Sequence, residues 1–250
     1  MNNRKSLLFV LPLIAMVLMA CGFSSNISFR NERVVGSGNV TSEERTVENF
    51  ERISLESTGE LTIIQGDEEG ITVEADDNLL PYIETRVSGH ELRIGFQRNV
   101  SIETRNPIRY TLRVKDLERI SVSGSGEVEA EALDTKKLSL EISGSGNVNI
   151  ADLQTEDLRV RVSGSGNFEL AGAAEEQDVT ISGSGNYNAS DLMSHRAVVN
   201  VTGSGDVTTW ADEELDVRVS GHGNVGYYGK PSISQSVTGS GEVKSLGEHE

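Results

Sequence analysis

Cysteine, proline and aromatic residues are scarce in this 250-residue chain, and each shortage narrows the possible structures. The only cysteine, Cys21, has no second thiol with which to form a disulfide or a cysteine-based metal site. Aromatic residues make up 5% of the chain and hydrophobic residues 36%, less bulk than a compact enzyme core usually carries. This composition favours a core of leucine and small β-branched side chains.

Basic residues are also in short supply, with 22 against 39 acidic residues and a net charge of −17. A surface of this sign repels nucleic acid and anionic lipid headgroups at long range, so we predict no nucleic-acid partner. The four histidines, at positions 90, 195, 222 and 249, show no ligand spacing, and we predict no metal site.

The longest apolar run, LLFVLPLIAMVLM at residues 7–19, is too short to cross a bilayer as a helix. It follows two basic residues, Arg4 and Lys5, in the arrangement of a signal peptide. The run ends at LMAC (18–21), which resembles a bacterial lipoprotein box, in which the cysteine is lipidated.

This resemblance predicts a signal peptide over residues 1–20, followed by lipidated Cys21 and a polar tether that together fill residues 21–35. It implies an exported protein anchored in a membrane through Cys21, at the outer membrane or cell surface, because Gly22 rather than aspartate follows the cysteine. More than one acyl chain is needed for stable anchoring. The alternative is an ordinary secretory signal with a cysteine nearby.

A glycine-rich phrase, SGSGNV at residues 143–148, recurs along the chain with a nearly constant period. The first glycine of each copy falls at 124, 144, 164, 183, 203, 221 and 239, so the intervals are 18 to 20 residues. A flexible linker would lack the patterned apolar flanks that these copies have. We predict structural corners at Gly124, Gly126, Gly144, Gly146, Gly164, Gly166, Gly183, Gly185, Gly203, Gly205, Gly239 and Gly241.

Apolar residues alternate with polar ones on both sides of each corner, as in LSLEIS (138–143) and NVNIADL (147–153). Each coil is therefore expected to contain a strand, a GSG corner, a second strand and a second corner. Since each coil copies the last in phase, the pattern favours a right-handed parallel β-helix over a β-sandwich. The expected coil length is about 20 residues. Stacked columns of corner serines and of asparagines are expected to hold the register.

We predict one β-helix domain over residues 36–250, with regular coils at 123–247 and irregular, wider coils at 36–122 that cap one end. Within the irregular part, residues 57–61 and 88–92 look like altered copies of the corner phrase. Residues 76–83, DDNLLPYI, are expected to hold one short helical turn.

The sequence carries no recognisable catalytic set, and we predict neither catalytic residues nor a cofactor. The GSG phrase lacks the further residues of nucleotide-binding loops, and no helix pattern follows it. Acidic residues follow the phrase too rarely for a calcium column, although incidental calcium binding stays open. The outward acids Glu141, Asp152, Glu169, Asp178 and Asp191 are scattered. The alternative is a polysaccharide hydrolase or lyase, for which two carboxylates and a base would have to meet across coils.

The aromatic residues near the last coils are the candidates for binding. Trp210 lies three residues after Val207, and Tyr228 lies three after Val225, so both are expected in one column on adjacent coils, with Tyr227 beside them. Exposed rings could stack on a sugar ring or on a partner's side chain. The alternative is that they plug the open end of the solenoid.

Several segments together resemble the head GIN domain family of autotransporter adhesins. They are GSGNV at 36–40, ERTVENFERISLESTGELTIIQGDEEGITVEADDNLLPYI at 44–83, VKDLERISVSGSGEV at 114–128 and the later GSG coils, and the likeness extends over 36–247. The resemblance implies a right-handed β-helix on an exported, often lipid-anchored bacterial protein, without catalytic residues. We therefore expect a non-catalytic envelope protein that binds a glycan or surface protein, with an envelope scaffold or sensor as a further alternative.

Overall fold

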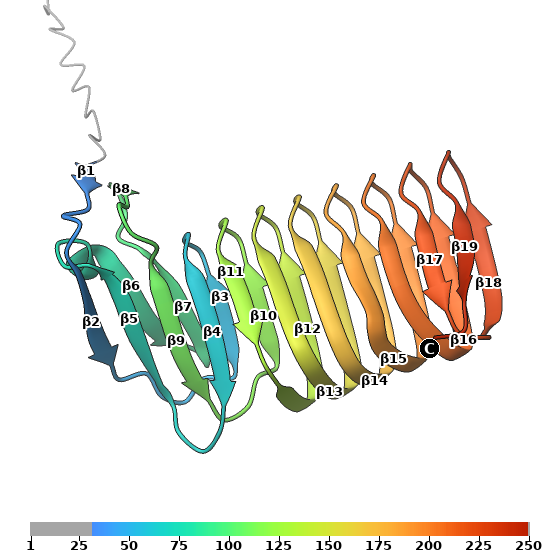
Figure 1. Cartoon of the computed structure of the whole chain (residues 1–250), viewed down its shortest axis with the longest axis horizontal. Helices are drawn as coiled ribbons and strands as arrows, with labels where there is room; N and C mark the ends of the chain where they lie inside the picture. Colours follow the sequence, from blue (N-terminus) through green and yellow to red (C-terminus); the bar gives the residue numbers. More distant parts are fainter. Residues whose placement is uncertain (1–31, 250) are drawn as a thin grey trace, which may run out of the picture. The chain divides into compact units, whose positions relative to one another are not determined.

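The structure, a computed structural model, describes residues 32–249, in which parallel strands follow one another in a row (Figure 1). The regular part consists of β10 (Arg119–Val122), β11 (Glu127–Ala130), β12 (Leu133–Ile142), β13 (Asn147–Val162), β14 (Asn167–Ile181), β15 (Tyr187–Val201), β16 (Val207–Val219), β17 (Val225–Tyr228), β18 (Ser232–Val237) and β19 (Val243–Gly247). Each coil pairs in parallel with the next, as Asn147 does with Asn167. The predicted parallel β-solenoid is confirmed, with about six turns and coils of about 20 residues.

The second corner of each coil does not interrupt the strand, which differs from the expected pair of separate strands. β13 runs without a break over 16 residues from one GSG corner to the next, because parallel pairing continues around the bend. The pairing register shifts at this bend, for example between Ile150 and Leu153. Differences in coil length are therefore absorbed at the second corner, while the GSG corners stay aligned.

Inward side chains form apolar columns along the solenoid. Residues Leu140, Val160, Val179, Val199 and Val217 pair in register, and all are 0% exposed. In a second column Phe168 and Tyr187 replace the valines of the coils on either side, and their rings meet edge to face at 6.5 Å. The alternation of apolar and polar residues in the sequence is thus the alternation of inward and outward side chains.

The coils at the start of the domain are not stacked in chain order. β3 (Arg52–Leu55) and β4 (Glu60–Gln65) pair on one side with β10 and β11. On the other side they pair with β7 (Glu91–Phe96) and β9 (Arg109–Val114), which come later in the chain than β3 and β4. The coil of residues 52–65 therefore lies between two coils that follow it in sequence, an exchange that the sequence pattern did not predict.

Antiparallel strands cover this end of the stack. β5 (Gly70–Asp76) runs antiparallel to both β2 (Val40–Arg45) and β9, and β6 (Ile83–Ser88) runs antiparallel to β7. β1 (Glu32–Val35) and β8 (Val100–Glu103) form a separate parallel pair. The 3₁₀ helix η1 (Leu80–Tyr82) lies within the segment for which a helical turn was predicted. Covering strands of this kind protect the backbone groups at a sheet edge.

Residues 88–92 do not form the corner that their likeness to the GSG phrase predicts. Gly89 and His90 have positive φ angles of 57° and 64°, and they join β6 to β7 as a tight antiparallel hairpin. Positive φ at both central residues matches the twist of such a hairpin. The phrase at 57–61 does lie at a coil corner, since Glu60 pairs in register with Glu127.

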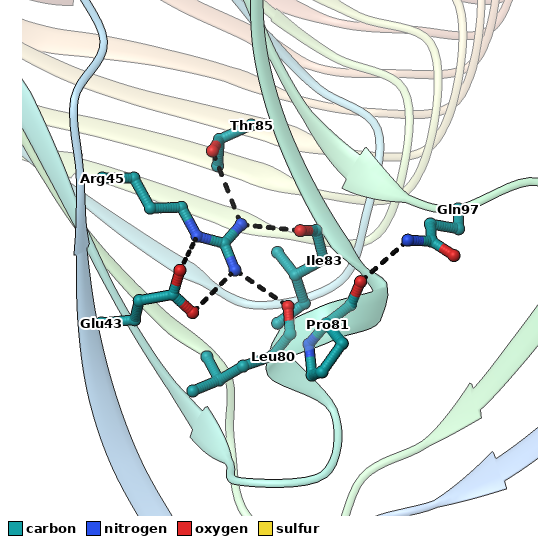
Figure 2. Close-up of polar contacts among 7 residues, drawn as sticks. All are labelled: Glu43, Arg45, Leu80, Pro81, Ile83, Thr85 and Gln97. Atoms are coloured by element: carbon teal, nitrogen blue, oxygen red, sulfur yellow. Dashed lines mark hydrogen bonds and ion pairs between the residues drawn. The ribbon is translucent and has the colours of Figure 1, made fainter.

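Arg45 connects the covering strands to the helical turn (Figure 2). Its guanidinium donates to the carbonyl oxygens of Leu80 at 2.8 Å and Ile83 at 2.6 Å, and it pairs with Glu43 at 3.2 Å. The first of these carbonyls belongs to η1 and also accepts the backbone N–H of Ile83, so Arg45 adds a second hydrogen bond to an oxygen already bonded within the turn. Gln97 donates to the Pro81 carbonyl from the other side at 2.8 Å, so the turn is held by two side chains (Figure 2).

Asp76 is the buried carboxylate of this end. It is fully buried, and it accepts hydrogen bonds from the Asn106 side chain at 2.7 Å and the Arg105 N–H at 3.2 Å. The bond from Asn106 holds the pKa of this carboxyl below its ordinary value, against the effect of burial. A Cβ atom at Gly36 would overlap the Asp76 carboxylate, so the opening GSG phrase is packed directly against it. Asp76 therefore joins the loop before β9, through its hydrogen bonds, to the opening phrase at the start of the domain.

Candidate functional site

The GSG corners form a column whose backbone donors are used between coils. The Ser145 N–H donates to the Gly124 carbonyl at 3.1 Å, and the Ser165 N–H donates to the Gly144 carbonyl at 3.0 Å. A phosphate-binding loop needs such N–H groups directed at the anion. Because these N–H groups already have partners, the corner geometry favours a structural role over ligand binding.

Asparagines after the corners form a hydrogen-bonded ladder along the outside. The side-chain oxygen of Asn147 accepts from the backbone N–H and the side-chain NH₂ of Asn167, at 3.2 and 3.0 Å. Asn186 makes the same two bonds to Asn167, and Asn224 makes them to Asp206. The ladder satisfies exposed amides within the protein and holds successive coils in register.

An outward apolar column crosses the second corner on successive coils. Trp210 pairs in register with Met193 on one side and Tyr228 on the other, and Met193 pairs with Ala173. All four side chains are partly exposed. The structure thus brings Trp210 and Tyr228 together as the sequence pattern suggested, and it adds two apolar neighbours.

Tyr227 points the other way. It pairs with the fully buried Thr209, and its side chain packs against the hydrophobic core. Of the three candidate binding residues, the structure therefore leaves two on the outer face and assigns Tyr227 to the core at the end of the solenoid.

His249 occupies the outer face of the aromatic column. Its ring lies parallel to the Trp210 ring, with centroids 4.2 Å apart and an angle of 5°. It meets the Tyr228 ring edge to face at 5.4 Å, and its Nε2 is 3.1 Å from a carboxylate oxygen of Asp191. We call Trp210, Tyr228 and Asp191 the aromatic platform. The platform holds a planar ring by stacking and by one polar contact at the ring edge.

Sequence reasoning missed two of these residues. His249 lies beyond the last GSG copy, and Asp191 is 58 positions away from it, so no period connects them. A signal was available only for Asp191, which lies close in sequence to Met193 in the outward column.

A histidine and a carboxylate, His195 and Asp212, flank the platform along the strands. His195, two residues after Met193, lies 3.2 Å from Asp212 on the next coil. The hydrogen bond that His195 donates to this carboxylate raises the pKa of the His195 side chain. The surroundings of the platform are thus polar and rich in acidic groups.

A shallow groove of about 300 Å³ lies on a different outer face, where β13 to β16 leave the second corner. We call it the outer groove; it is lined by Asp157, Leu158, Arg159, Glu176, Gln177, Asp178, Arg196, Ala197, Val198, Glu214 and Asp216. The acids come together because they recur near the coil period, as Asp157 and Glu176 do. The outward acids were predicted to be scattered, and the groove shows that this prediction was wrong for the acids that follow the second corner.

Three of the five carboxylates that line the outer groove are engaged in ion pairs at the surface. Arg196 pairs with Glu176, and Arg218 pairs with Asp216 at 2.8 Å. Lys137 pairs with Asp157 at 2.8 Å and holds the pKa of that carboxyl below its ordinary value. A general acid at neutral pH needs the opposite shift, which burial would supply. None of the groove carboxylates is buried.

A polar cluster is buried inside the solenoid near the aromatic column. The Tyr187 hydroxyl donates to the Gln177 side-chain oxygen at 2.7 Å, and the Thr209 hydroxyl donates to the same oxygen at 3.3 Å. Burial raises the pKa of Tyr187. The three side chains satisfy one another in the core, so this cluster is structural.

The remaining predictions concern anchoring and metal binding. Cys21, the predicted lipidation site, lies outside the described residues, as does the predicted signal peptide. Residues 32–249 contain no helix long and apolar enough to cross a membrane. Over the same residues, no group of three or more histidine, cysteine, aspartate or glutamate side chains is placed to hold a metal ion.

The fold defines a class of protein, the repeat proteins whose stacked coils form a solenoid. Residues 49–231 match a family model described as "Putative auto-transporter adhesin, head GIN domain". The match spans most of the chain, and the chain belongs to the head GIN domain family, as the resemblance predicted.

Solved structures of other proteins share this fold. The chain is similar to a crystal structure described as a putative adhesin from Bacteroides fragilis, with 28% identity, a TM-score of 0.82, and coverage of 85% of this chain and 100% of that one. It shares its fold with a structure described as a putative lipid binding protein from Parabacteroides distasonis, at 24% identity, a TM-score of 0.72, and 86% and 100% coverage. A structure described as a putative adhesin from Parabacteroides merdae has 24% identity, a TM-score of 0.70, and 86% and 99% coverage. No curated protein matches the sequence.

Proposed function

We propose that this protein is an exported envelope protein whose β-solenoid binds a macromolecule at a cell surface without catalysing a reaction. The aromatic platform carries the proposal, because it presents two aromatic rings on the surface of an acidic chain and already holds the His249 ring by stacking. The adhesin description of the family supports it. The long paired strands support it as well, since they hold an outward column rigidly across coils.

Anchoring through Cys21 is part of the proposal and rests on the LMAC segment alone. Changing Cys21 to serine removes the thiol that would be acylated and is expected to release the protein from the membrane fraction. Mass spectrometry of the N-terminal peptide from the native protein provides the direct measurement. An unmodified Cys21, or a chain that retains residues 1–20, would contradict the anchor without affecting binding by the solenoid.

The binding function is tested by comparing a deletion strain with the same strain complemented by the full-length gene. We expect the deletion to reduce adhesion to host glycans, cell-wall polymer or other cells, and complementation to restore it. Purified full-length protein is expected to bind the same surface directly. Normal adhesion and envelope integrity in the deletion strain, together with no direct binding, would refute the proposal. Recovery of a stable envelope complex instead would favour a scaffold or sensor.

The outer groove favours a second candidate, a polysaccharide hydrolase or lyase. It places several carboxylates and Arg196 on one face, which is the arrangement that such chemistry requires. Its surface ion pairs argue against a proton-donating carboxyl, so binding stays the preferred function. Product release from a panel of acidic and neutral polysaccharides, lost on changing Glu176 to glutamine, would establish the enzyme.

A further inference from the structure

We propose that the aromatic platform is a binding site for an uncharged sugar ring of a glycan, and that His249 occupies this site in the absence of the glycan. The inference rests on the proposed binding function and names its site and ligand class. Three features of the platform carry it: the way His249 is held, the charge around it, and the paired strands beneath it.

His249 shows what kind of group the platform accepts. The platform presents the flat face of Trp210 at 4.2 Å, the Tyr228 ring at its side, and an acceptor, Asp191, at 3.1 Å from a ring nitrogen. A sugar ring has the same two properties, an apolar C–H face that stacks on an aromatic ring and hydroxyl groups at its edge that donate to a carboxylate. Stacking and one charged acceptor together fix both the plane and the rotation of such a ring.

The charge near the platform selects against an acidic sugar. Asp191 forms part of the platform, and Asp212 lies on the coil of Trp210 with its neighbour Glu213. The chain as a whole carries a net charge of −17. A uronic acid or sulfated sugar would be repelled at this surface, whereas a neutral sugar would not.

The strands beneath the platform do not offer an edge to a peptide. β16, which carries Trp210, is paired with β15 on one side and with β17 and β18 on the other. A peptide cannot add a strand at this place, so recognition depends on side-chain faces. Met193 and Ala173 continue the column on the two coils below, roughly 4.8 Å apart per coil, and they give a second ring of the same glycan an apolar surface to contact.

His249 must leave before a sugar can stack on Trp210, because both need the same face. Removal of the imidazole should therefore tighten glycan binding by about threefold to tenfold, the range expected for one aromatic stack. Loss of the Trp210 ring should weaken binding more than tenfold, since the ring provides the stacking face. Changing Asp191 to asparagine should weaken binding by a smaller factor, because the amide oxygen still accepts a hydrogen bond.

Trp210 is the only tryptophan in the chain, so its fluorescence reports directly on the platform. Full-length protein is titrated with neutral glucose, mannose and N-acetylglucosamine oligosaccharides, with polygalacturonate as the acidic probe and a histidine-containing peptide as the peptide probe. We expect a saturable change in emission with at least one neutral oligosaccharide, and a lower Kd for His249→Ala. Asp152→Asn, an exposed acid at the second corner of β13, is the matched control and should bind as the wild type does.

The results separate this inference from the proposed function. An emission change only with polygalacturonate or only with the peptide would overturn the inference, as would a His249→Ala variant that binds neutral glycans no more tightly than the wild type. If a Trp210→Ala strain adheres normally while the deletion strain does not, the function stands and the platform is not its site. Circular dichroism establishes that each variant is folded, and isothermal calorimetry measures Kd for the variant that lacks Trp210.

Discussion

Glycine at the corners is required by the approach of the neighbouring coil. The corner residue Gly144 does not have the positive φ angle that favours glycine elsewhere, as at Gly89. A Cβ atom at Gly144 would instead overlap the carbonyl oxygen of Gly124. Turns use glycine either for an unusual backbone angle or because another chain segment approaches closely. Gly144 is required for the second reason.

Replacing Gly144 with alanine should therefore destabilise the protein by roughly 3 kcal/mol, because the coils cannot separate locally without losing their pairing. Urea unfolding followed by circular dichroism gives the free energy of unfolding. Ser145→Ala is the control: the serine column was expected to hold the register, but the contact to the coil below is made by the Ser145 backbone N–H, so loss of the exposed side chain should change stability by no more than about 0.5 kcal/mol. Equal stability of the two variants would show that the corner tolerates a side chain.

Burial of Tyr110 makes the domain less stable at alkaline pH. It is 0% exposed, and its hydroxyl lies 3.3 Å from that of Ser57. Burial raises its pKa to about 12, while an unfolded tyrosine has a pKa of about 10. The native state therefore favours the neutral phenol. The stability from this group is complete below pH ~10 and is lost as the pH rises toward ~12.

The free energy of unfolding should accordingly fall between pH ~10 and ~12, and Tyr110→Phe should reduce this fall. Phenylalanine has no ionisable hydroxyl, so the variant loses one of the groups that release a proton on unfolding. The buried Tyr187 contributes in the same direction, so a Tyr110→Phe, Tyr187→Phe double variant should show the flattest profile. A wild-type profile that is flat over this range would contradict the assignment.

The asparagine ladder stabilises the stack as a column, and each rung depends on the one before it. Asn167 donates two hydrogen bonds to Asn147 and accepts two from Asn186. Asp206 shows that a carboxylate can replace the accepting half, since it accepts both bonds from Asn224. The donor and acceptor functions of a rung are therefore separable.

Asn167→Ala should lower stability by about 1 kcal/mol, and Asn167→Asp should lower it by less, because aspartate still accepts from Asn186. Thermal unfolding of the two variants gives this order directly. Asn149→Ala, at an exposed position two residues after the ladder on β13, serves as the matched control and should be nearly neutral. Equal stability of the two Asn167 variants would mean that side-chain donation to Asn147, which both variants lose, is the more important half.

The regular coils could be predicted from the sequence because corner, strand and ladder recur together at each period. The same period would have revealed the outer groove, since Asp157, Glu176 and Arg196 stand in register. The exchange of coils at the start of the domain could not be predicted in this way. It depends on pairing between β3 and β7, whose partners Arg52 and Glu91 are far apart in sequence and lie outside the regular repeat. His249 lies outside the repeat as well, so its position on Trp210 required the structure.

A solenoid in which each coil contacts mainly its neighbours can be shortened by removing a whole coil. Each regular coil pairs mainly with the coils directly before and after it. In such proteins stability is close to a sum over coils and the interfaces between them. Removing one coil should therefore shorten the solenoid without changing the fold, provided that the corners remain in register.

Deleting residues 143–162 provides the test, because Ile142 and Val162 pair in register and both precede a Ser-Gly-Ser-Gly phrase. The deletion joins Ile142 to Ser163 and places Gly164 over Gly124. We expect a folded protein that is less stable by about 1 to 3 kcal/mol, the share of one coil, with a smaller denaturant m-value. Deleting only residues 143–152 should abolish cooperative unfolding, because it joins Ile142 to Leu153 and removes the corner. If both deletions unfold the chain, the coils depend on contacts beyond their neighbours, and the covering strands at the first end would have to stabilise the stack as a whole.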